Sequence, residues 1–312
     1  MKYILASLFT FVFDFSFSQT ITESQIDSLI DGIKKTVIEN YVVTDKAKLI
    51  CDSLSSIHYS NITLIDSLLK KLNQDLFYLS NDKHLFLQYR PAVAENLLKH
   101  VDIHADQNKK EKKEHYGFEK ITILDGNIAY LKLNYFADAT NAKKAVLKYI
   151  RHYKNTVALI IDLRNNFGGS GTMLQLLAGI FLPVNQDEIL KINYRTGNVV
   201  NLKATQINPD KQYLKQPIYI LCDSQTYSAG EAFAFIMKNR GRAVLIGATT
   251  AGAGNVAGPH PINTRFVLTI PVGIIVDPLT NTGWEHTGVT PDINTDAGQE
   301  LAKAIELIQT KK

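Results

Sequence analysis

The sequence predicts an α/β protein with a small helical N-terminal part, and three observations lead to this class. Between residues 20 and 80, apolar side chains recur at the spacing of amphipathic helices. From Phe118 onward, strand-like and helix-like stretches alternate, as they do in α/β sheets. Within that alternation, the β-rich run at residues 218–222 passes through a turn into a helical pattern that begins at Ser228.

Composition excludes several classes of protein. The chain has 312 residues, of which 45% are hydrophobic and 21% are charged, and it is long enough for two globular domains. The net charge of +4 is small and the basic residues are scattered, so no nucleic-acid partner is expected. Cys51 and Cys222 lie far apart, which excludes a disulfide framework and leaves a single bridge as an option. No metal-binding spacing is present, and we expect neither a metal nor a cofactor.

Residues 1–18 are typical of a cleaved secretory signal peptide. Lys2 is followed by an apolar run over residues 3–13, by Asp14, and then by small residues at Ser16 and Ser18. Cleavage after Ser18 would give a mature protein that begins at Gln19 and works in the periplasm or outside the cell. The run is too short to cross a bilayer, so no stable membrane span is expected after cleavage. A buried first helix is the alternative.

An N-terminal helical domain is predicted over residues 19–104. Three apolar stripes define its helices: Ile26, Leu29, Ile30, Ile33 and Val37; Ala47, Ile50, Cys51 and Leu54; and Leu64, Leu68, Leu69, Leu72 and Leu76. Ser24 is the expected N-cap of the first helix. A polar turn at residues 80–83 then delivers His84 to the start of a strand. Residues 105–117 are dense in charge and predict a solvated linker.

A second domain, residues 118–312, alternates strands and helices. A buried strand at residues 157–163 ends in a turn that contains Gly168 and Gly169, and a helix follows. The glycine spacing fits neither a phosphate loop nor a dinucleotide fold. It suits a backbone that approaches a ligand closely and exposes its N–H groups. Later strands are predicted at residues 243–247, 266–271 and 274–277, followed by a C-terminal helix from about residue 296.

Ser228 has two interpretations. It stands where a strand turns into a helix, beside N–H groups that stabilise negative charge, and this suits a nucleophile whose attack creates an oxyanion. The stretch Ser228-Ala-Gly-Glu231 also matches the capping box, in which serine and glutamate bind the first N–H groups of a helix. Taken alone, this stretch favours the interpretation of Ser228 as a helix cap. The choice between a cap and a nucleophile depends on motifs elsewhere in the chain.

Four motifs together resemble one family. They are Asp162-Leu-Arg-Asn-Asn-x-Gly-Gly169, Thr226-x-Ser-Ala-Gly-Glu231, Gly247-x-Thr-Thr-x-Gly252 and Gly288-Val-x-Pro-Asp292. In order and spacing they resemble the tail-specific, or C-terminal-processing, serine proteases. The similar branch is that of interphotoreceptor retinoid-binding protein-like and tricorn-like peptidases without a PDZ domain. The resemblance implies a crotonase-like ββα-spiral catalytic domain with Ser228 as nucleophile. It also implies an oxyanion hole made by the N–H of Ala229 and of a glycine in the pair Gly168 and Gly169.

The resemblance also bears on the general base. Processing proteases carry a lysine where this chain has Ala253, so a serine–lysine dyad at that position is ruled out. His84 and Glu285 match a histidine and a glutamate of the tricorn-like branch, which implies a histidine base whose tautomer the glutamate fixes. Lys83 stands where that branch has a serine that links the two. The alternative bases, which lie near the same predicted loops, are His260 and His286.

These residues predict a serine-type peptidase that cleaves peptides or unfolded proteins through an acyl-enzyme, with Ser228, His84 and Glu285 as catalytic residues. The retinoid-binding branch implies an alternative, in which the same scaffold binds apolar ligands or peptides with little or no catalysis. Hydrolysis of a non-peptide ester or amide is a further alternative. Asp162 and Arg164 are predicted to pair and to hold the turn after their strand.

Overall fold

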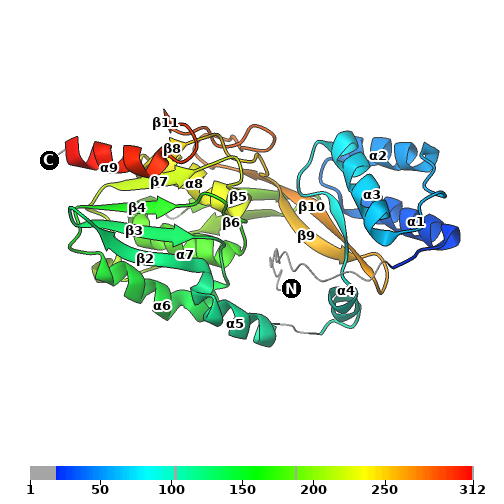
Figure 1. Ribbon diagram of the computed structural model, residues 1–312, viewed down its shortest axis with the longest axis horizontal. Coiled ribbons are helices and arrows are strands. Elements are labelled where there is room, and N and C mark those ends of the chain that lie inside the picture. Colours follow the sequence, from blue (N-terminus) through cyan, green and yellow to red (C-terminus); the bar gives the residue numbers. More distant parts are fainter. Residues whose placement is uncertain (1–18, 102–103, 187, 311–312) are drawn as a thin grey trace.

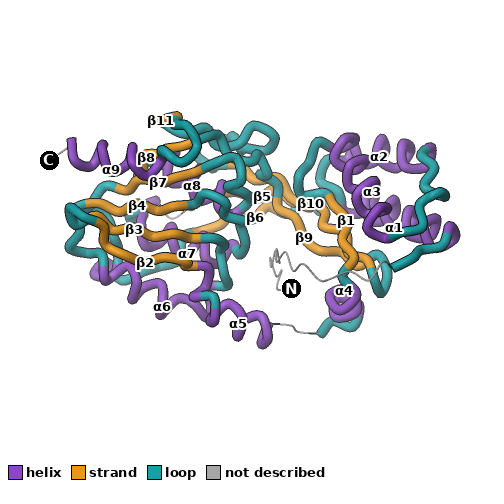
Figure 2. Tube along the Cα trace, viewed as in Figure 1, coloured by secondary structure: helices purple, strands orange, loops and turns teal. Residues whose placement is uncertain are grey.

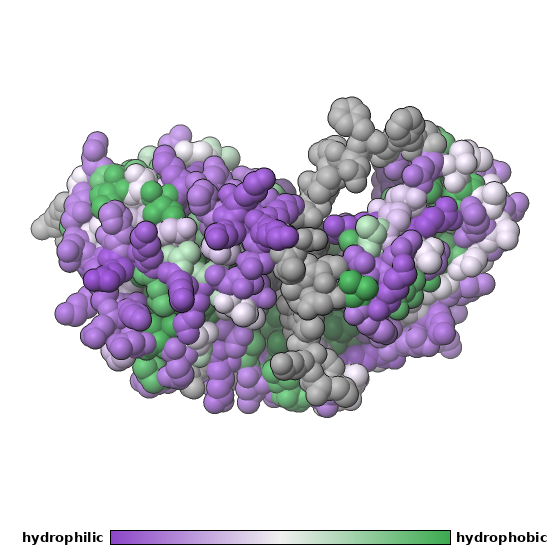
Figure 3. All heavy atoms as spheres, turned by 90° about the horizontal axis from the view of Figure 1, so that it is seen from below, coloured by the Kyte–Doolittle hydropathy of each residue, from purple (hydrophilic) through white to green (hydrophobic). Residues whose placement is uncertain are grey.

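A computed structural model describes residues 19–101, 104–186 and 188–310 and shows a mixed α/β protein with two lobes (Figure 1). The predicted signal peptide, residues 1–18, lies outside the described residues. One sheet has six strands and the other has five, and the second sheet extends from one lobe into the other (Figure 2). Seen from below, hydrophilic side chains dominate the surface of both lobes (Figure 3). No described helix is long and apolar enough to span a membrane.

Three helices form most of the N-terminal lobe: α1 (Glu23–Asn40), α2 (Thr44–Ser56) and α3 (Ile65–Ser80). Most residues of the predicted apolar stripes are buried between them in one core. The cap predicted at Ser24 is wrong. Helix α1 begins after Thr22, which exchanges hydrogen bonds with Gln25 in a capping box, so Ser24 already lies inside the helix.

A strand from the C-terminal part of the chain completes this lobe. Strand β10 (Phe266–Val276) pairs antiparallel with β1 (Phe86–Tyr89) and with β9 (Val256–Pro261). Phe266, Leu268 and Ile270 are buried in the same core as the three helices. The prediction of separate strands at 266–271 and 274–277 is wrong, because the chain continues through an irregularity between Pro271 and Gly273 as one strand.

The charged segment between the lobes is largely helical. After α4 (Pro91–Leu98) the chain forms α5 (His104–Lys113) and a short 3-10 helix, His115–Gly117. The segment predicted as a solvated linker therefore holds a helix. Its charges lie at helical spacing, and Lys110 approaches Glu114 to 4.0 Å.

The six-stranded sheet has the order β11-β8-β7-β4-β3-β2. Its strands are β2 (Phe118–Leu124), β3 (Ile128–Leu133), β4 (Ala158–Asp162), β7 (Ile218–Cys222), β8 (Ala243–Gly247) and β11 (Ile293–Asn294). Strands β2 and β3 form an antiparallel hairpin, and the other neighbours are parallel. One face is covered by α6 (Ala139–His152), α7 (Gly171–Phe181) and α8 (Ala229–Asn239), and the other by α9 (Glu300–Thr310) (Figure 1).

Strand β10 also reaches the second lobe. Its far end pairs with β5 (Glu188–Tyr194), which in turn pairs with β6 (Val199–Lys203). One strand thus pairs with β1, which follows the turn that carries His84, at one end and with β5 in the second lobe at the other.

The parallel strands β4 and β7 are neighbours, so their carboxyl ends meet at one edge of the larger sheet. The turn after β4 carries Gly168 and Gly169, and the turn after β7 carries Ser228. The N–H of Tyr227 donates to the carbonyl of Asn166 at 2.9 Å and joins the two turns. The topology thus brings together two motifs that lie far apart in the sequence.

Candidate active site

Ser228 occupies a strained turn at the start of α8. Its φ is +52° and its ψ is −117°, a conformation that residues other than glycine rarely adopt. The residue is half-buried, and the helix begins at Ala229. As the first residue of the helix, Ala229 carries one of the N–H groups that have no intrahelical acceptor. The hydroxyl-bearing residue therefore lies beside a group that can bind an anion.

The glycine turn after β4 touches Ser228. Gly168 has a φ of +81°, and a methyl group added to it would lie 2.7 Å from the Ser228 Cβ and 3.0 Å from the Ala229 nitrogen. Only glycine fits there. The N–H of Gly168 donates to Asn166 Oδ1 at 2.9 Å. The oxyanion role of Gly168 and Gly169 stays a prediction, supported by their position against the candidate nucleophile.

Glu231 joins the start of α8 to the loop after β8. Its buried carboxylate accepts four hydrogen bonds, from the Ser228, Gly252 and Ala253 N–H groups and from the Thr250 hydroxyl, at 2.6 to 2.9 Å. The predicted capping box is present, and in it the Ser228 N–H donates to Glu231 Oε2. The carboxylate also fixes a second loop, which the capping motif does not predict.

His84 is buried beside the residue that precedes Ser228. It is 4% exposed, and its ring lies edge-on to that of Tyr227, with 4.9 Å between the ring centroids. One ring nitrogen of His84 and one carboxylate oxygen from each of Asp82 and Glu285 lie within 4.8 Å of one another. The fold therefore gathers a histidine and two acids next to the serine turn.

Glu285 approaches this group from the loop before β11. Its Oε2 accepts hydrogen bonds from the Gly254 and Asn255 N–H groups at 2.5 and 2.8 Å, which fix the side chain. The other oxygen, Oε1, is buried, as is Nδ1 of His84, and neither forms a hydrogen bond to any described group. His84 Nδ1 thus has no hydrogen-bond partner among the described groups, whereas Glu285 Oε1 lies 3.3 Å from His286 Nδ1. Both atoms can receive or give a proton.

Burial opposes charge on both titratable groups. The pKa of His84 is lowered to about 4, because burial opposes protonation more strongly than the Asp82 charge favours it. The pKa of Glu285 is raised to about 7, first by burial and then by the charge of Asp82. Near neutral pH the imidazole is therefore uncharged, as a general base must be, and Glu285 is partly protonated.

Both the N-terminal part and the larger C-terminal part of this chain match models of known protein families. Residues 127–295, more than half of the chain, match the model of peptidase family S41. The chain belongs to peptidase family S41. Residues 20–116 match the model described as the N-terminal domain of peptidase S41 in eukaryotic IRBP.

Individual relatives share less than a third of their residues with this chain over the matched segments. A tail-specific protease of Haemophilus influenzae is 28% identical over 160 residues, which are 51% of this chain and 22% of that protein. A carboxy-terminal-processing protease of Bartonella bacilliformis is 29% identical over 177 residues, 54% of this chain and 39% of that protein. This chain thus spans less than half the length of these two relatives. A putative peptidase of Parabacteroides merdae shares the fold, with a TM-score of 0.62, 18% identity and coverage of 92% of this chain and 97% of that one.

In this S41 chain, Lys83 faces away from the cluster of His84 and Glu285. Its Nζ donates to the Ala251 carbonyl at 2.5 Å, and its own carbonyl accepts from the Tyr227 hydroxyl at 2.9 Å. Lys83 thus clamps the turn before β1 against the serine turn and the loop after β8. Asp82, one residue earlier, is the side chain that lies with the histidine and the glutamate.

The other two histidines that the sequence left open have different surroundings. His260 lies on β9, half-buried, with Nδ1 3.3 Å from the Gly258 carbonyl, and burial lowers its pKa. His286 is 40% exposed, and its Nδ1 lies 3.3 Å from Glu285 Oε1 on the solvent side. Of the three histidines, His84 alone both contacts the serine turn through Tyr227 and lies in the buried cluster.

Sequence reasoning missed two further residues of the S41 site. Asn166 donates from Nδ2 to the Leu133 carbonyl at 2.6 Å and accepts from Gly168, and so it shapes the glycine turn. Phe167 is 50% exposed in the same turn. The signal for both is their place inside the Asp162-to-Gly169 motif, in which roles are predicted for Asp162, Arg164 and the two glycines.

The predicted pairing of Asp162 with Arg164 is confirmed. Arg164 Nη2 lies 2.5 Å from Asp162 Oδ2, and Nη1 lies 2.7 Å from Glu300 Oε2 on α9. Burial alone would raise the pKa of Asp162, but hydrogen bonds from Arg164 and Tyr130 hold it below its usual value. The pair therefore fastens the end of β4 to the C-terminal helix.

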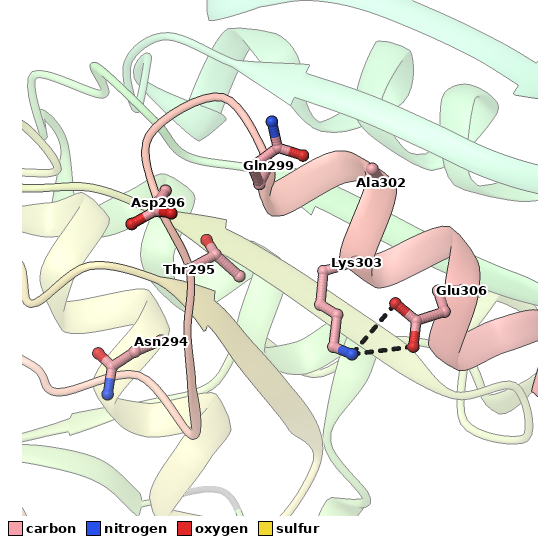
Figure 4. Close-up of a pocket in the computed structure, with 7 residues that line it drawn as sticks. All are labelled: Asn294, Thr295, Asp296, Gln299, Ala302, Lys303 and Glu306. Atoms are coloured by element: carbon pink, nitrogen blue, oxygen red, sulfur yellow. Dashed lines mark hydrogen bonds and ion pairs between the residues drawn. The ribbon is translucent and has the colours of Figure 1, made fainter.

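Two surface hollows lie away from this chemistry. One, of about 500 Å³, is formed by the loop before α9 and by the helix itself (Figure 4). Its side chains include the ion pair of Lys303 with Glu306 at 2.9 Å. The other, of about 440 Å³, is lined by Asp162 and Arg164 among others. Neither is lined by Ser228 or His84, so the site is recognised by its side chains and not by cavity size.

Within the described ranges, Asp82, His84 and Glu285 form the one cluster of acids and histidine compact enough to hold a cation. Its donors are one imidazole nitrogen and two carboxylate oxygens. The same atoms could act on Ser228 instead, with the imidazole as general base and the two carboxylates as the groups that stabilise the protonated ring. We interpret the cluster in that way.

Proposed function

We propose that this S41 chain is a serine-type peptidase with Ser228 as nucleophile, His84 as general base and Glu285 as the carboxylate that orients the base. One observation carries the proposal. His84 and Glu285, which come from opposite ends of the chain, lie in one buried cluster beside the ring of Tyr227, the neighbour of Ser228. A histidine buried together with two acids is an arrangement typical of functional sites.

In the proposed reaction, the Ser228 hydroxyl attacks the carbonyl carbon of the substrate while its proton passes to His84. The buried acids stabilise the imidazolium that forms. The N–H of Ala229 at the start of α8, and the backbone of Gly168 and Gly169 against it, would bind the oxyanion. His84 then returns the proton to the leaving amine, and water repeats the sequence on the acyl-enzyme.

Peptides and unfolded proteins are the proposed substrates. Membership of a peptidase family supports this class, as do the names of the relatives. The half-exposed ring of Phe167 lies beside the glycine turn and offers an apolar contact for a substrate side chain. The proposed site needs no cofactor or nucleic acid.

Three finer proposals accompany this function. The larger sheet with its covering helices is proposed to be a crotonase-like ββα-spiral catalytic domain over residues 118–312, preceded by an N-terminal domain over residues 19–104. The chain is proposed to be exported and processed to a protein that begins near Gln19. N-terminal sequencing of protein from the native cell would refute export if it found an intact Met1 on cytoplasmic material.

Labelling with a fluorophosphonate probe tests the function. We expect the probe to modify wild type at Ser228, shown by peptide mass spectrometry, and to leave His84→Ala almost unlabelled. His260→Ala is the matched control, because it makes the same substitution at a half-buried histidine outside the cluster and should label normally. If folded wild type is not labelled and does not hydrolyse an unstructured peptide, the alternative of a binding protein for apolar ligands or peptides takes its place.

A further inference from the structure

Asp82 lies at the centre of the contacts that hold His84. The residue is 1% exposed, and both carboxylate oxygens accept hydrogen bonds. Oδ1 accepts from the His84 N–H at 2.9 Å, and Oδ2 accepts from the Tyr41 hydroxyl at 3.2 Å and from Asn255 Nδ2 at 3.3 Å. One carboxylate therefore joins the end of α1, the turn before β1 and the loop before β9.

We infer that Asp82 is a positioning residue of the site: it holds the backbone of His84 and places a fixed negative charge beside both the His84 ring and Glu285. The expected effect of Asp82 on catalysis rests on the proposed peptidase function, whereas its expected effect on the pKa of Glu285 does not. Neither the family comparisons nor the motifs assign a role to this residue.

The chemistry of the cluster requires such a charge. Proton transfer from Ser228 would create a buried imidazolium, which is unstable without an anion nearby. Glu285 is partly protonated near neutral pH, so it supplies only part of that charge. All three groups that bind the Asp82 carboxylate are hydrogen-bond donors. Lys83 cannot supply this negative charge because it is a cation, and its Nζ donates to the Ala251 carbonyl.

The ionisable groups around His84 come from every neighbouring segment. They are Tyr41 at the end of α1, Asp82 and Lys83 in its own turn, Tyr227 and Glu231 at the start of α8, and Glu285 and His286 before β11. Burial raises the pKa of Tyr41 and of Tyr227 far above neutrality, so both hydroxyls stay protonated. Glu231 is held by four donors. Asp82 and Glu285 are thus the acids whose charge acts most directly on the ring.

Asp82→Asn separates charge from geometry. The amide oxygen of asparagine can still accept from the His84 N–H, but the negative charge is gone. We expect the rising limb of kcat/KM, with a midpoint near the Glu285 pKa of about 7, to move to lower pH by about one pH unit. The plateau should fall by about tenfold, because the imidazolium loses one of its two anions. A residue with only a structural role would leave the midpoint in place.

Asp75→Asn is the matched control. Asp75 lies in the same lobe, and its Oδ2 accepts from the Tyr59 hydroxyl at 2.8 Å, much as Asp82 accepts from Tyr41. It has no place in the cluster. The same chemical change at Asp75 should therefore leave both the midpoint and the plateau of kcat/KM unchanged.

A second measurement does not depend on activity. In protein with ¹³C-labelled glutamate and Ser228→Ala, the carboxyl resonance of Glu285, assigned with Glu285→Gln, gives the Glu285 pKa directly. We expect Asp82→Asn to lower it. An unchanged Glu285 titration would overturn the inference even if wild type is an active peptidase. An inactive wild type with a shifted Glu285 titration would refute the proposed function alone.

Tyr41→Phe tests the same inference if Asp82→Asn does not fold. Loss of the hydroxyl removes one donor to Asp82 and leaves more of its charge to act on the cluster. The Glu285 titration should then move to higher pH, opposite to the effect of Asp82→Asn. No movement in Tyr41→Phe would overturn the inference.

Discussion

The N–H of Ser228 donates to the carboxylate of Glu231 at 2.9 Å, and this contact ties the candidate nucleophile to a second loop. The same carboxylate accepts from the N–H groups of Gly252 and Ala253. The backbone of Ser228 is therefore fixed relative to the loop after β8, which continues to the Gly254 and Asn255 donors that hold Glu285. Glu231 and Glu285 thus support the site from opposite sides of one loop.

Glu231→Gln should destabilise the fold by about 2–4 kcal/mol. Glutamine keeps one oxygen that can accept, but its N–H₂ group replaces the other oxygen. That group would face N–H groups that donate to Glu231 in the wild type, so buried donors would lose their acceptor. Urea unfolding of wild type and variant gives the difference. Glu306→Gln, which alters an exposed partner of Lys303, should change the stability by less than about 0.5 kcal/mol. Equal losses in the two variants would contradict the role given to Glu231.

Gly168→Ala should abolish most probe labelling of Ser228. The new methyl group would lie 2.7 Å from the Ser228 Cβ, so the serine turn must move. Gly197→Ala is the control: Gly197 has a similar φ of +84°, but no atom lies within 4 Å of the added carbon. It should cost only the backbone strain, about 1 kcal/mol, and label normally. Normal labelling of Gly168→Ala would show that the turn does not constrain the nucleophile.

Ser228→Ala and Ser228→Thr separate a cap from a nucleophile. If Ser228 acts mainly as a cap, the alanine variant should lose about 1 kcal/mol of stability and little else. If Ser228 is the nucleophile, the rate of peptide hydrolysis by the alanine variant should fall by several orders of magnitude, because alanine has no atom to acylate. Threonine keeps a hydroxyl but adds a methyl group to a crowded turn, and we expect it to retain most stability and lose most activity. Thermal unfolding and turnover of an unstructured peptide provide the two measurements. Full hydrolysis by folded Ser228→Ala would end the peptidase proposal.

Glu285→Gln should become increasingly stabilising as the pH rises. The folded-state pKa of Glu285, about 7, lies above its ordinary value of 4.5, so the folded protein binds the extra proton between these values. Wild type therefore loses stability as the pH rises through this window, whereas glutamine does not titrate. The difference between variant and wild type should grow by about 2–3 kcal/mol from pH 5 to pH 8. Denaturant unfolding at both pH values measures it, and a constant difference would mean that Glu285 is not perturbed.

Local sequence was enough to predict the strand, turn and helix around Ser228. Residues 218–222 form a continuous apolar run that is buried throughout, and the helical spacing begins at Ser228, so short-range preferences agree with the fold there. The N-terminal helices followed from the same kind of pattern. The cap at Thr22, the unbroken strand β10 and the helix α5 did not follow, because capping partners, strand pairing and charge spacing compete within a few residues of each boundary.

The sequence by itself determined which residues could do chemistry: a serine at a strand-to-helix turn, a glycine pair, a histidine after a polar turn and a glutamate near the C-terminus. Only the tertiary structure decided which of them meet. Pairing of β1 with β10 carries His84 to the serine turn, and the loop before β11 brings Glu285 to it. Burial then shifts the pKa of His84 and of Glu285. The fold also brings Asp82 into the cluster, although the family resemblance draws attention to its neighbour Lys83. Contact and desolvation depend on groups distant along the chain, so no local pattern could have specified them.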